Sequence, residues 1–174
     1  MALITRLRFS LFLLSIAVLA GCGYHLTNSP AHRLTAGQQI WVPFIGNESI
    51  SPTAQTVLRR GLYAESHALR GLTPSGNESA ADLIVKGRLL SYTNTVTSYS
   101  AIDQVRSYRL AISVELEIYR KGEVTPYWKG VLNAAKEYPA NIDLALQRSA
   151  EESALDAASR VISQKFISAI EQSY

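Results

Sequence analysis

Large apolar residues alternate with small or polar ones from Tyr108 to Ile118. The apolar positions are Leu110, Ile112, Val114, Leu116 and Ile118. Successive side chains of a β-strand point to opposite faces of a sheet, so this period of two predicts a strand with one buried face and one polar face. The fold must therefore contain a sheet that is covered on at least one face.

Three further segments have the composition of strands. Residues 39–45 are apolar, but Pro43 cannot donate a hydrogen bond to a neighbouring strand, which favours an edge strand or the end of a strand. Residues 82–99 are rich in Val, Ile, Leu, Thr and Tyr and are divided by Gly87, so they form one bent strand or two pieces. Residues 126–138 follow a turn and return as another strand.

Two segments have the periodicity of amphipathic helices. A helix is expected over residues 52–69, because Ser51 can cap the first turn and Pro52 suits the first helical position. A longer helix is expected over residues 142–172, which contain no Pro or Gly and place apolar residues three or four positions apart. The order of elements predicts an α+β fold, a two-layer sandwich with two helices packed on one face of a roughly four-stranded, mainly antiparallel sheet.

Such a sandwich leaves the second face of the sheet without cover from its own helices. If Leu83, Val85 and Leu89 face the helices, strand alternation turns their neighbours outward. The outward set is Ile84, Lys86, Arg88, Leu90 and Tyr92. Cations expected near this face in the next strands are Arg106, Arg109, Lys129 and Lys136. A face that mixes apolar, aromatic and basic groups is either solvated or meets a partner.

The N-terminus has the layout of an export signal. Arg6 and Arg8 precede an apolar run of 12 residues from Phe9 to Ala20. A helix needs about 20 apolar residues to cross a bilayer, so cleavage is favoured over a retained anchor. Loss of the two arginines would lower the number of basic side chains from 17 to 15, against 14 acidic ones. This balance gives no indication of a nucleic acid partner.

The apolar run ends in Leu19-Ala20-Gly21-Cys22, which resembles the lipobox of bacterial lipoproteins. The resemblance implies cleavage before Cys22 and addition of lipid to its sulfur and of an acyl chain such as palmitate to its new amine. Gly23 stands where an aspartate would favour retention in the inner membrane, so the expected location is the periplasmic side of the outer membrane. The alternative is an ordinary secretory signal, with Cys22 a free thiol or half of an intermolecular disulfide. The expected organisation is a cleaved signal peptide over residues 1–21, a lipidated tether over 22–38 and a single α+β domain over 39–174.

The residues that usually carry catalysis or bind metals are not arranged in a recognisable site. His25, His32 and His67 have no carboxylate at metal-ligand spacing, and the chain has one cysteine. The sequence contains no nucleophile elbow, phosphate-binding loop or zinc-protease motif. Glu115 and Glu117 share the polar side of a strand and could imitate a catalytic pair, but exposed strand glutamates are usually solvated. We therefore expect a protein that is not an enzyme and that has no cofactor and no metal.

Several segments, taken in order, resemble the lipopolysaccharide (LPS)-assembly lipoprotein family LptE. The string Cys22-Gly23-Tyr24-His25-Leu26 is similar to the start of the mature chain in that family. The other similar segments are residues 42–49, 82–88, 91–92, 108–110 and 137–140 and the closing helix. Together they cover nearly the whole mature chain.

This resemblance implies a non-catalytic lipoprotein that forms the plug of the LptD β-barrel in a 1:1 complex. It further implies that the protein helps to assemble that barrel, binds LPS and assists its insertion into the outer leaflet. LPS carries phosphates and acyl chains, which suit a face with basic and apolar groups. The candidate LPS-binding residues are Lys86, Arg88, Arg106, Arg109 and Lys136.

Two other functions remain open from the residues. An outer-membrane lipoprotein adaptor that regulates a cell-wall synthase, or that helps to build a secretion pore, would share the lipobox and a strand like that of residues 42–47. A periplasmic hydrolase would depend on a carboxylate such as Glu115. The proteins that co-purify with this chain would separate the first alternative from the LptE role.

Overall fold

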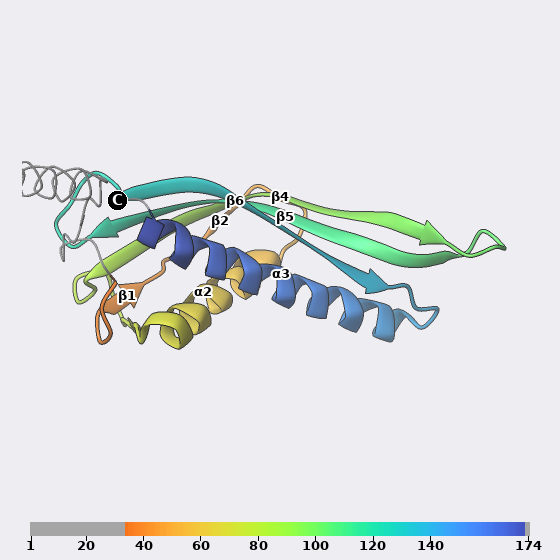
Figure 1. The fold of residues 1–174 in the computed structure, drawn as a ribbon, viewed down its shortest axis with the longest axis horizontal. Coiled ribbons are helices and arrows are strands. Elements are labelled where there is room, and N and C mark those ends of the chain that lie inside the picture. Colours follow the sequence, from red (N-terminus) through yellow and green to blue (C-terminus); the bar gives the residue numbers. More distant parts are fainter. Residues whose placement is uncertain (1–33, 173–174) are drawn as a thin grey trace, which may run out of the picture. The chain divides into compact units, whose positions relative to one another are not determined.

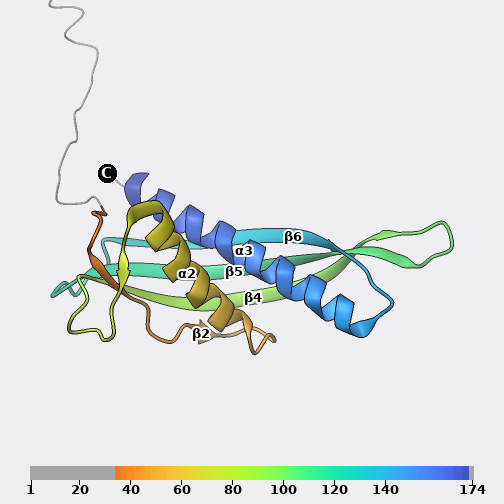
Figure 2. The same ribbon diagram turned by 90° about the horizontal axis from the view of Figure 1, so that it is seen from below.

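The computed structural model describes residues 34–172. The predicted signal peptide, the predicted lipidation site Cys22 and most of the predicted tether lie outside the described residues. The elements are β1 (Gln39–Trp41), β2 (Gly46–Asn47), α2 (Ala54–Arg70), β3 (Thr73–Pro74), β4 (Leu83–Tyr99), β5 (Val105–Arg120), β6 (Trp128–Pro139) and α3 (Leu144–Gln172). Both helices pack on the same face of the sheet (Figures 1 and 2). Neither of them combines the length and the apolar content that crossing a bilayer requires.

The described sheet has six strands in the order β3-β1-β4-β5-β6, with β2 paired to β4 outside this path. β4, β5 and β6 are antiparallel neighbours. β1 pairs in parallel with both β3 and β4, and β2 pairs in parallel with β4. The predicted α+β sandwich is confirmed, with six strands rather than about four. β2 and β3 have two residues each, too few to give a periodic signal. β1 ends before Pro43, which has no N–H for the ladder.

β4 and β5 form a long hairpin. They pair as far as Tyr99 opposite Val105, whereas β6 stops at Pro139, opposite Ser107. The distal part of the hairpin therefore projects beyond the end of β6 (Figure 2). Of the two forms that the sequence allowed for residues 82–99, the structure has the single strand.

The hydrophobic core lies between the sheet and the helices. Phe166 of α3 is fully buried and packs edge-to-face against Trp128 of β6, with ring centroids 5.3 Å apart. The stripe of α3 expected in the core is buried throughout, at Leu155, Ala158, Ile162, Phe166 and Ile170. Removal of these side chains from water is the main contribution that holds α3 on the sheet.

The first helix differs from its prediction at its start. α2 begins at Ala54, and its N-cap is Thr53 rather than Ser51, without a hydrogen bond from the cap side chain. The helix ends at Arg70, and its C-cap is Gly71, whose φ of 65° is the left-handed conformation that favours glycine after a helix. The predicted end of the helix is therefore correct within one or two residues.

The two helices approach closely at Gly61. A Cβ atom at this position would lie 3.3 Å from Ser163 Oγ and 3.5 Å from the Cβ of Ser159. Both serines are fully buried, and Ser163 Oγ donates a hydrogen bond to the Ser159 carbonyl at 2.9 Å. Small side chains on both helices thus allow α2 and α3 to cover one sheet face side by side.

Candidate functional site

A bulge in β4 decides which side chains face the helices. Leu89 pairs with Val114, and Ser91 pairs with Ser113, so Leu90 is an extra residue without a partner in β5. Beyond the bulge, the alternation of faces is shifted by one residue. We call the sheet face opposite the helices the outer face. The residues that lie on it beyond the bulge therefore differ from those predicted.

Tyr92 is the clearest consequence of this shift. It pairs with the buried Ile112 and lies on the helix side, not on the outer face as expected. Its hydroxyl donates a hydrogen bond to the Glu151 carboxylate of α3. Burial raises the pKa of Tyr92 well above its usual value, and the neighbouring Glu151 adds to this effect.

One end of the outer face carries a network of ion pairs. Arg88 contacts Glu48 at 2.8 Å and Glu115 at 3.0 Å, measured from guanidinium nitrogen to carboxylate oxygen. Lys129 Nζ lies 3.3 Å from Glu115 Oε1 and 2.6 Å from Glu117 Oε1. Hydrogen bonds from Arg88 and Lys129 lower the pKa of Glu115, and one from Lys129 lowers the pKa of Glu117. We call this network, with its neighbour Lys86, the outer-face charge cluster.

Two of the five candidate LPS-binding residues belong to this cluster. Lys86 Nζ lies 4.9 Å from the centroid of the Tyr119 ring, and Arg88 already contacts two carboxylates. A phosphate would have to compete with these glutamates, so the cluster is a poor site for an anion. Because the pKa values of Glu115 and Glu117 are lowered, neither has the raised pKa that a general acid needs.

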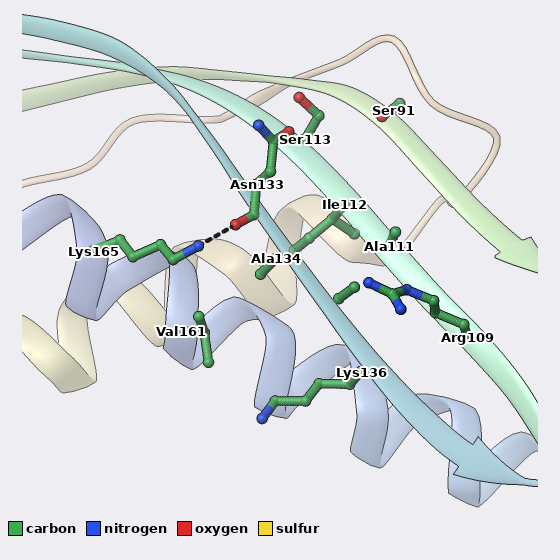
Figure 3. Close-up of a pocket in the computed structure, with 11 residues that line it drawn as sticks. Ser91, Arg109, Ala111, Ile112, Ser113, Asn133, Ala134, Lys136, Val161 and Lys165 are labelled. Carbon is green, nitrogen blue, oxygen red and sulfur yellow. Dashed lines mark hydrogen bonds between the residues drawn. The ribbon is translucent and has the colours of Figure 1, made fainter.

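A hollow of about 500 Å³ lies across β6, the edge strand of the sheet, next to α3 (Figure 3). We call it the β6-edge groove. Its cations are Arg109 of β5, Lys136 of β6 and Lys165 of α3, and most of its other side chains are Ala or Ser. No carboxylate in the described part of the chain lines it. The groove is therefore the more basic of the two surfaces.

The three cations reach the groove from different directions. Lys165 Nζ donates a hydrogen bond to the Asn133 carbonyl at 2.7 Å and so covers a carbonyl of the edge strand (Figure 3). Lys136 pairs with the buried Leu110, so it lies on the helix side of β6 and not on the outer face as expected. Arg109 is exposed, and its Nη1 lies 4.0 Å from Glu137 Oε1. A ligand at this edge would meet positive charge from both sides of the sheet.

The sequence analysis did not identify Lys165 as a groove residue. A lysine on the polar side of an amphipathic helix is normally solvated. Val161 and Lys165 are one helical turn apart, and both line the groove. Their spacing indicates a shared helix face, but only the tertiary structure shows that β6 lies beside it.

The five candidate residues do not form one site. Arg109 and Lys136 meet at the groove, whereas Lys86 and Arg88 lie in the charge cluster. Arg88 is opposite Glu115, six residues from Arg109 along β5, which corresponds to about 20 Å of strand. Arg106 lies on the other side of Arg109, toward the tip of the hairpin.

Comparisons with known proteins agree with this architecture. Solved structures with similar folds include a hypothetical protein from Chlamydia trachomatis, with a TM-score of 0.53, 8% identity and coverage of 78% of this chain and 96% of that chain. A candidate lipoprotein from Caulobacter crescentus has a TM-score of 0.52 and 13% identity, with 72% of this chain and 86% of that chain covered. A protein from Xanthomonas campestris has a TM-score of 0.51 and 12% identity, with 83% and 92% covered.

At these identities, the similar structures establish the fold alone. The search of curated proteins found no match. The model of the LptE family, described as lipopolysaccharide-assembly, matches residues 37–170, which include every strand of the described sheet and nearly all of α3. The chain therefore belongs to the LptE family of lipopolysaccharide-assembly proteins.

Proposed function

We propose that this protein is a non-catalytic lipoprotein of the outer membrane that forms the plug of the LptD β-barrel. In this role it is attached through Cys22 to the periplasmic side of the membrane, helps LptD to assemble in a 1:1 complex and assists insertion of LPS. The observation that carries the proposal is the LptE family match over residues 37–170. The β6-edge groove supplies a physical reason for contact with LPS.

The groove suits the phosphate groups of LPS. Arginine and lysine bind phosphate through charge-assisted hydrogen bonds, and the groove brings Arg109, Lys136 and Lys165 together without a lining carboxylate from the described residues. The Ala and Ser side chains between them leave room for a bulky headgroup. The outer-face charge cluster has as many carboxylates as cations, and this balance favours the groove as the site of contact.

The outer face suits the inside of a β-barrel. Beside the charge cluster, this face carries two rows of small or polar residues that lie in register across three strands. The rows are Ser91, Ser113 and Asn133, and Thr93, Ala111 and Ala135. The interior of a large outer-membrane barrel is polar, and a sheet face of small and polar side chains is compatible with it. All of these residues except Thr93 also line the β6-edge groove, so LPS held in the groove would lie between this face and the barrel wall.

An affinity pull-down tests the partner. The full lipidated chain, carrying an affinity tag, would be recovered from outer membranes solubilised in detergent, and the co-purifying proteins identified by mass spectrometry. We expect LptD in near-equal amount, and a Cys22→Ser variant controls for capture that depends on membrane attachment. Recovery of a cell-wall synthase without LptD, or of no partner, would contradict the proposal.

Depletion of the protein tests the role in the cell. New LPS should stop reaching the cell surface, while incorporation of labelled precursors into peptidoglycan continues. An unchanged amount of LPS at the cell surface would contradict the proposed function. A primary defect in peptidoglycan synthesis would favour the adaptor alternative.

A further inference from the structure

Large apolar side chains are exposed at one end of the sheet. Six of them lie in two short segments, the distal part of the β4–β5 hairpin and the beginning of α3. Ile142 is fully exposed, and Leu144 and Ile102 are exposed by 75% and 74%. We call this surface the apolar end, and its members are Val96, Tyr99, Ile102, Ile142, Leu144 and Leu146. Such a concentration of exposed apolar groups is typical of an interaction surface.

The strand register brings these two segments to the same end. Ser107 is opposite Pro139, and just beyond this pair the Ala140 N–H donates a hydrogen bond to the Arg106 carbonyl at 2.9 Å. The hairpin and the β6–α3 connection both continue past this bond. Figures 1 and 2 show the hairpin tip and the beginning of α3 at the end of the sheet opposite the C-terminal end of α3.

Local hydrogen bonds hold the beginning of α3 in place. Asp143 Oδ1 accepts hydrogen bonds from the N–H groups of Ala145 and Leu146, at 2.8 and 3.1 Å. The Asn141 N–H donates to Gln147 Oε1 at 2.8 Å. The leucines of the first helical turn are therefore exposed on a capped helix, where the backbone is already ordered before any ligand binds.

Cations lie beside the apolar end. Arg106 is an extra residue of β5 near the tip of the hairpin, because its neighbours Ser107 and Val105 have consecutive partners in β4. Arg106, Lys136 and Arg148 form no ion pair with any described residue. Of the nearby acids, Asp143 uses a carboxylate oxygen to cap α3, and Glu137 lies beside Arg109. Asp103 lies at the hairpin tip, and Glu151 and Glu152 line a hollow together with Arg148.

We infer that the apolar end holds acyl chains of the same phosphorylated glycolipid whose phosphates bind the β6-edge groove. This inference rests on the proposed LPS role. Arg109 of the groove pairs with Thr95, the neighbour of Val96 in the apolar end, and Lys136 lies six residues before Ile142, so the groove borders the apolar end. Unpaired cations between a basic groove and an exposed apolar surface match an amphiphile that carries anionic and acyl groups in one molecule.

Photo-crosslinking in intact cells tests the inference with the full chain. A photoreactive phenylalanine analogue would replace Ile142 or Leu146 in the apolar end, and Ala135 in the groove. Val124, which is 92% exposed in the β5–β6 turn, provides a matched apolar control away from both surfaces. After irradiation, adducts would be identified by immunoblotting with antibodies against LPS and against LptD. Lipid mass spectrometry would identify adducts with other lipids.

We expect LPS adducts at positions 135, 142 and 146, several-fold stronger than at position 124. LPS adducts at position 135 alone would overturn the inference and leave the proposed function standing. Adducts of positions 142 and 146 with LptD or with phospholipid in place of LPS would overturn it as well. If none of the positions gave an LPS adduct, both the proposed contact with LPS and the inference would be contradicted.

A double substitution provides a second measurement. With the analogue kept at position 135, the substitutions Ile142→Ser and Leu146→Gln should reduce the LPS adduct in the groove several-fold, because the acyl chains lose their contacts. Val124→Ser should leave that adduct unchanged. Equal adduct yields in the two backgrounds would contradict the inference. Because Ile142 and Leu146 are exposed, these changes leave the core intact.

Discussion

The Tyr92 hydroxyl donates a hydrogen bond to the Glu151 carboxylate and so joins β4 to α3 just beyond the bulge at Leu90. This contact exists because the bulge turns Tyr92 toward the helices. It marks the point at which the long hairpin leaves the cover of the core, since most residues of β4 beyond it are exposed.

Replacement of Tyr92 by Phe should therefore weaken the attachment of the hairpin to α3. We expect a loss of about 1 kcal/mol in the free energy of unfolding, which is less than is usual for a hydrogen bond to a charged group because the pair is only partly buried. Urea unfolding of the full chain in detergent, followed by circular dichroism, measures it. Tyr99→Phe, at an exposed position of the same strand, is the control and should change nothing.

The same pair predicts a pH dependence. The pKa of Tyr92 is raised in the folded state above its ordinary value of 10.0, so its contribution to stability is complete below pH 10 and is lost as the pH rises toward the folded-state pKa. The stability of the wild-type protein should fall above pH 10 more steeply than that of the Tyr92→Phe variant. If stability fell with pH in parallel for the two proteins, the Tyr92 hydroxyl would have the same pKa in the folded and the unfolded state.

Periodicity accounts for the parts of the fold that were predicted correctly. The alternation in β5 and the apolar stripe of α3 identify their buried faces, and the order of elements predicts both helices on one sheet face. The sheet faces predicted for Tyr92 and Lys136 were wrong, for different reasons. A bulge leaves no mark in composition, because Leu90 is as apolar as a paired strand residue. Lys129 and Lys136 are seven residues apart on a regular strand, so alternation alone excludes a shared face, and the register with β5 places Lys129 on the outer face and Lys136 on the helix side.

The bulge leads to an unusual prediction for deletions. Since Leu90 is the extra residue, its removal leaves Leu89 and Tyr92 on the helix side and Ser91 on the outer side. A protein without Leu90 should fold, with its free energy of unfolding lowered by no more than about 2 kcal/mol. Deletion of Lys86, four residues earlier, should prevent folding, because it turns either Val85 or Leu89 out of the core.

Thermal unfolding followed by circular dichroism compares the two deletions. The variant without Leu90 should show a cooperative transition near that of the wild type, and the variant without Lys86 should show none. If both deletions abolished folding, the bulge would be an essential part of the sheet and not a tolerated insertion.

Gly61 allows α2 and α3 to pack closely. In a Gly61→Val variant the new side chain would meet Ser159 and Ser163, both fully buried, and we expect overpacking to cost about 1–3 kcal/mol. Chemical denaturation measures this loss. Gly76→Ala is the matched control, because a Cβ at Gly76 has no atom within 4 Å and the change should be close to neutral. Equal stability of the two variants would show that α2 and α3 can separate without cost.

The two basic surfaces can be distinguished by paired lysine substitutions. Lys136→Gln removes a cation from the β6-edge groove, where no ion pair within residues 34–172 holds it, and Lys86→Gln removes one from the charge cluster. If the groove binds LPS phosphates, loss of one charge-assisted contact should weaken binding about tenfold for Lys136→Gln. The Lys86→Gln variant should bind within about twofold of the wild type, because neighbouring carboxylates already offset the charge of the cluster.

Binding of labelled LPS to the purified full chain, measured over a range of salt concentrations, provides the comparison. The difference between the variants should shrink as salt rises, because exposed charges are screened within about 10 Å at 0.1 M salt. A Lys136→Arg variant keeps the charge and should recover most of the affinity, which separates loss of the cation from a change in packing. If Lys86→Gln weakened binding as much as Lys136→Gln, phosphate recognition would extend over the outer face, and the groove would lose its special role.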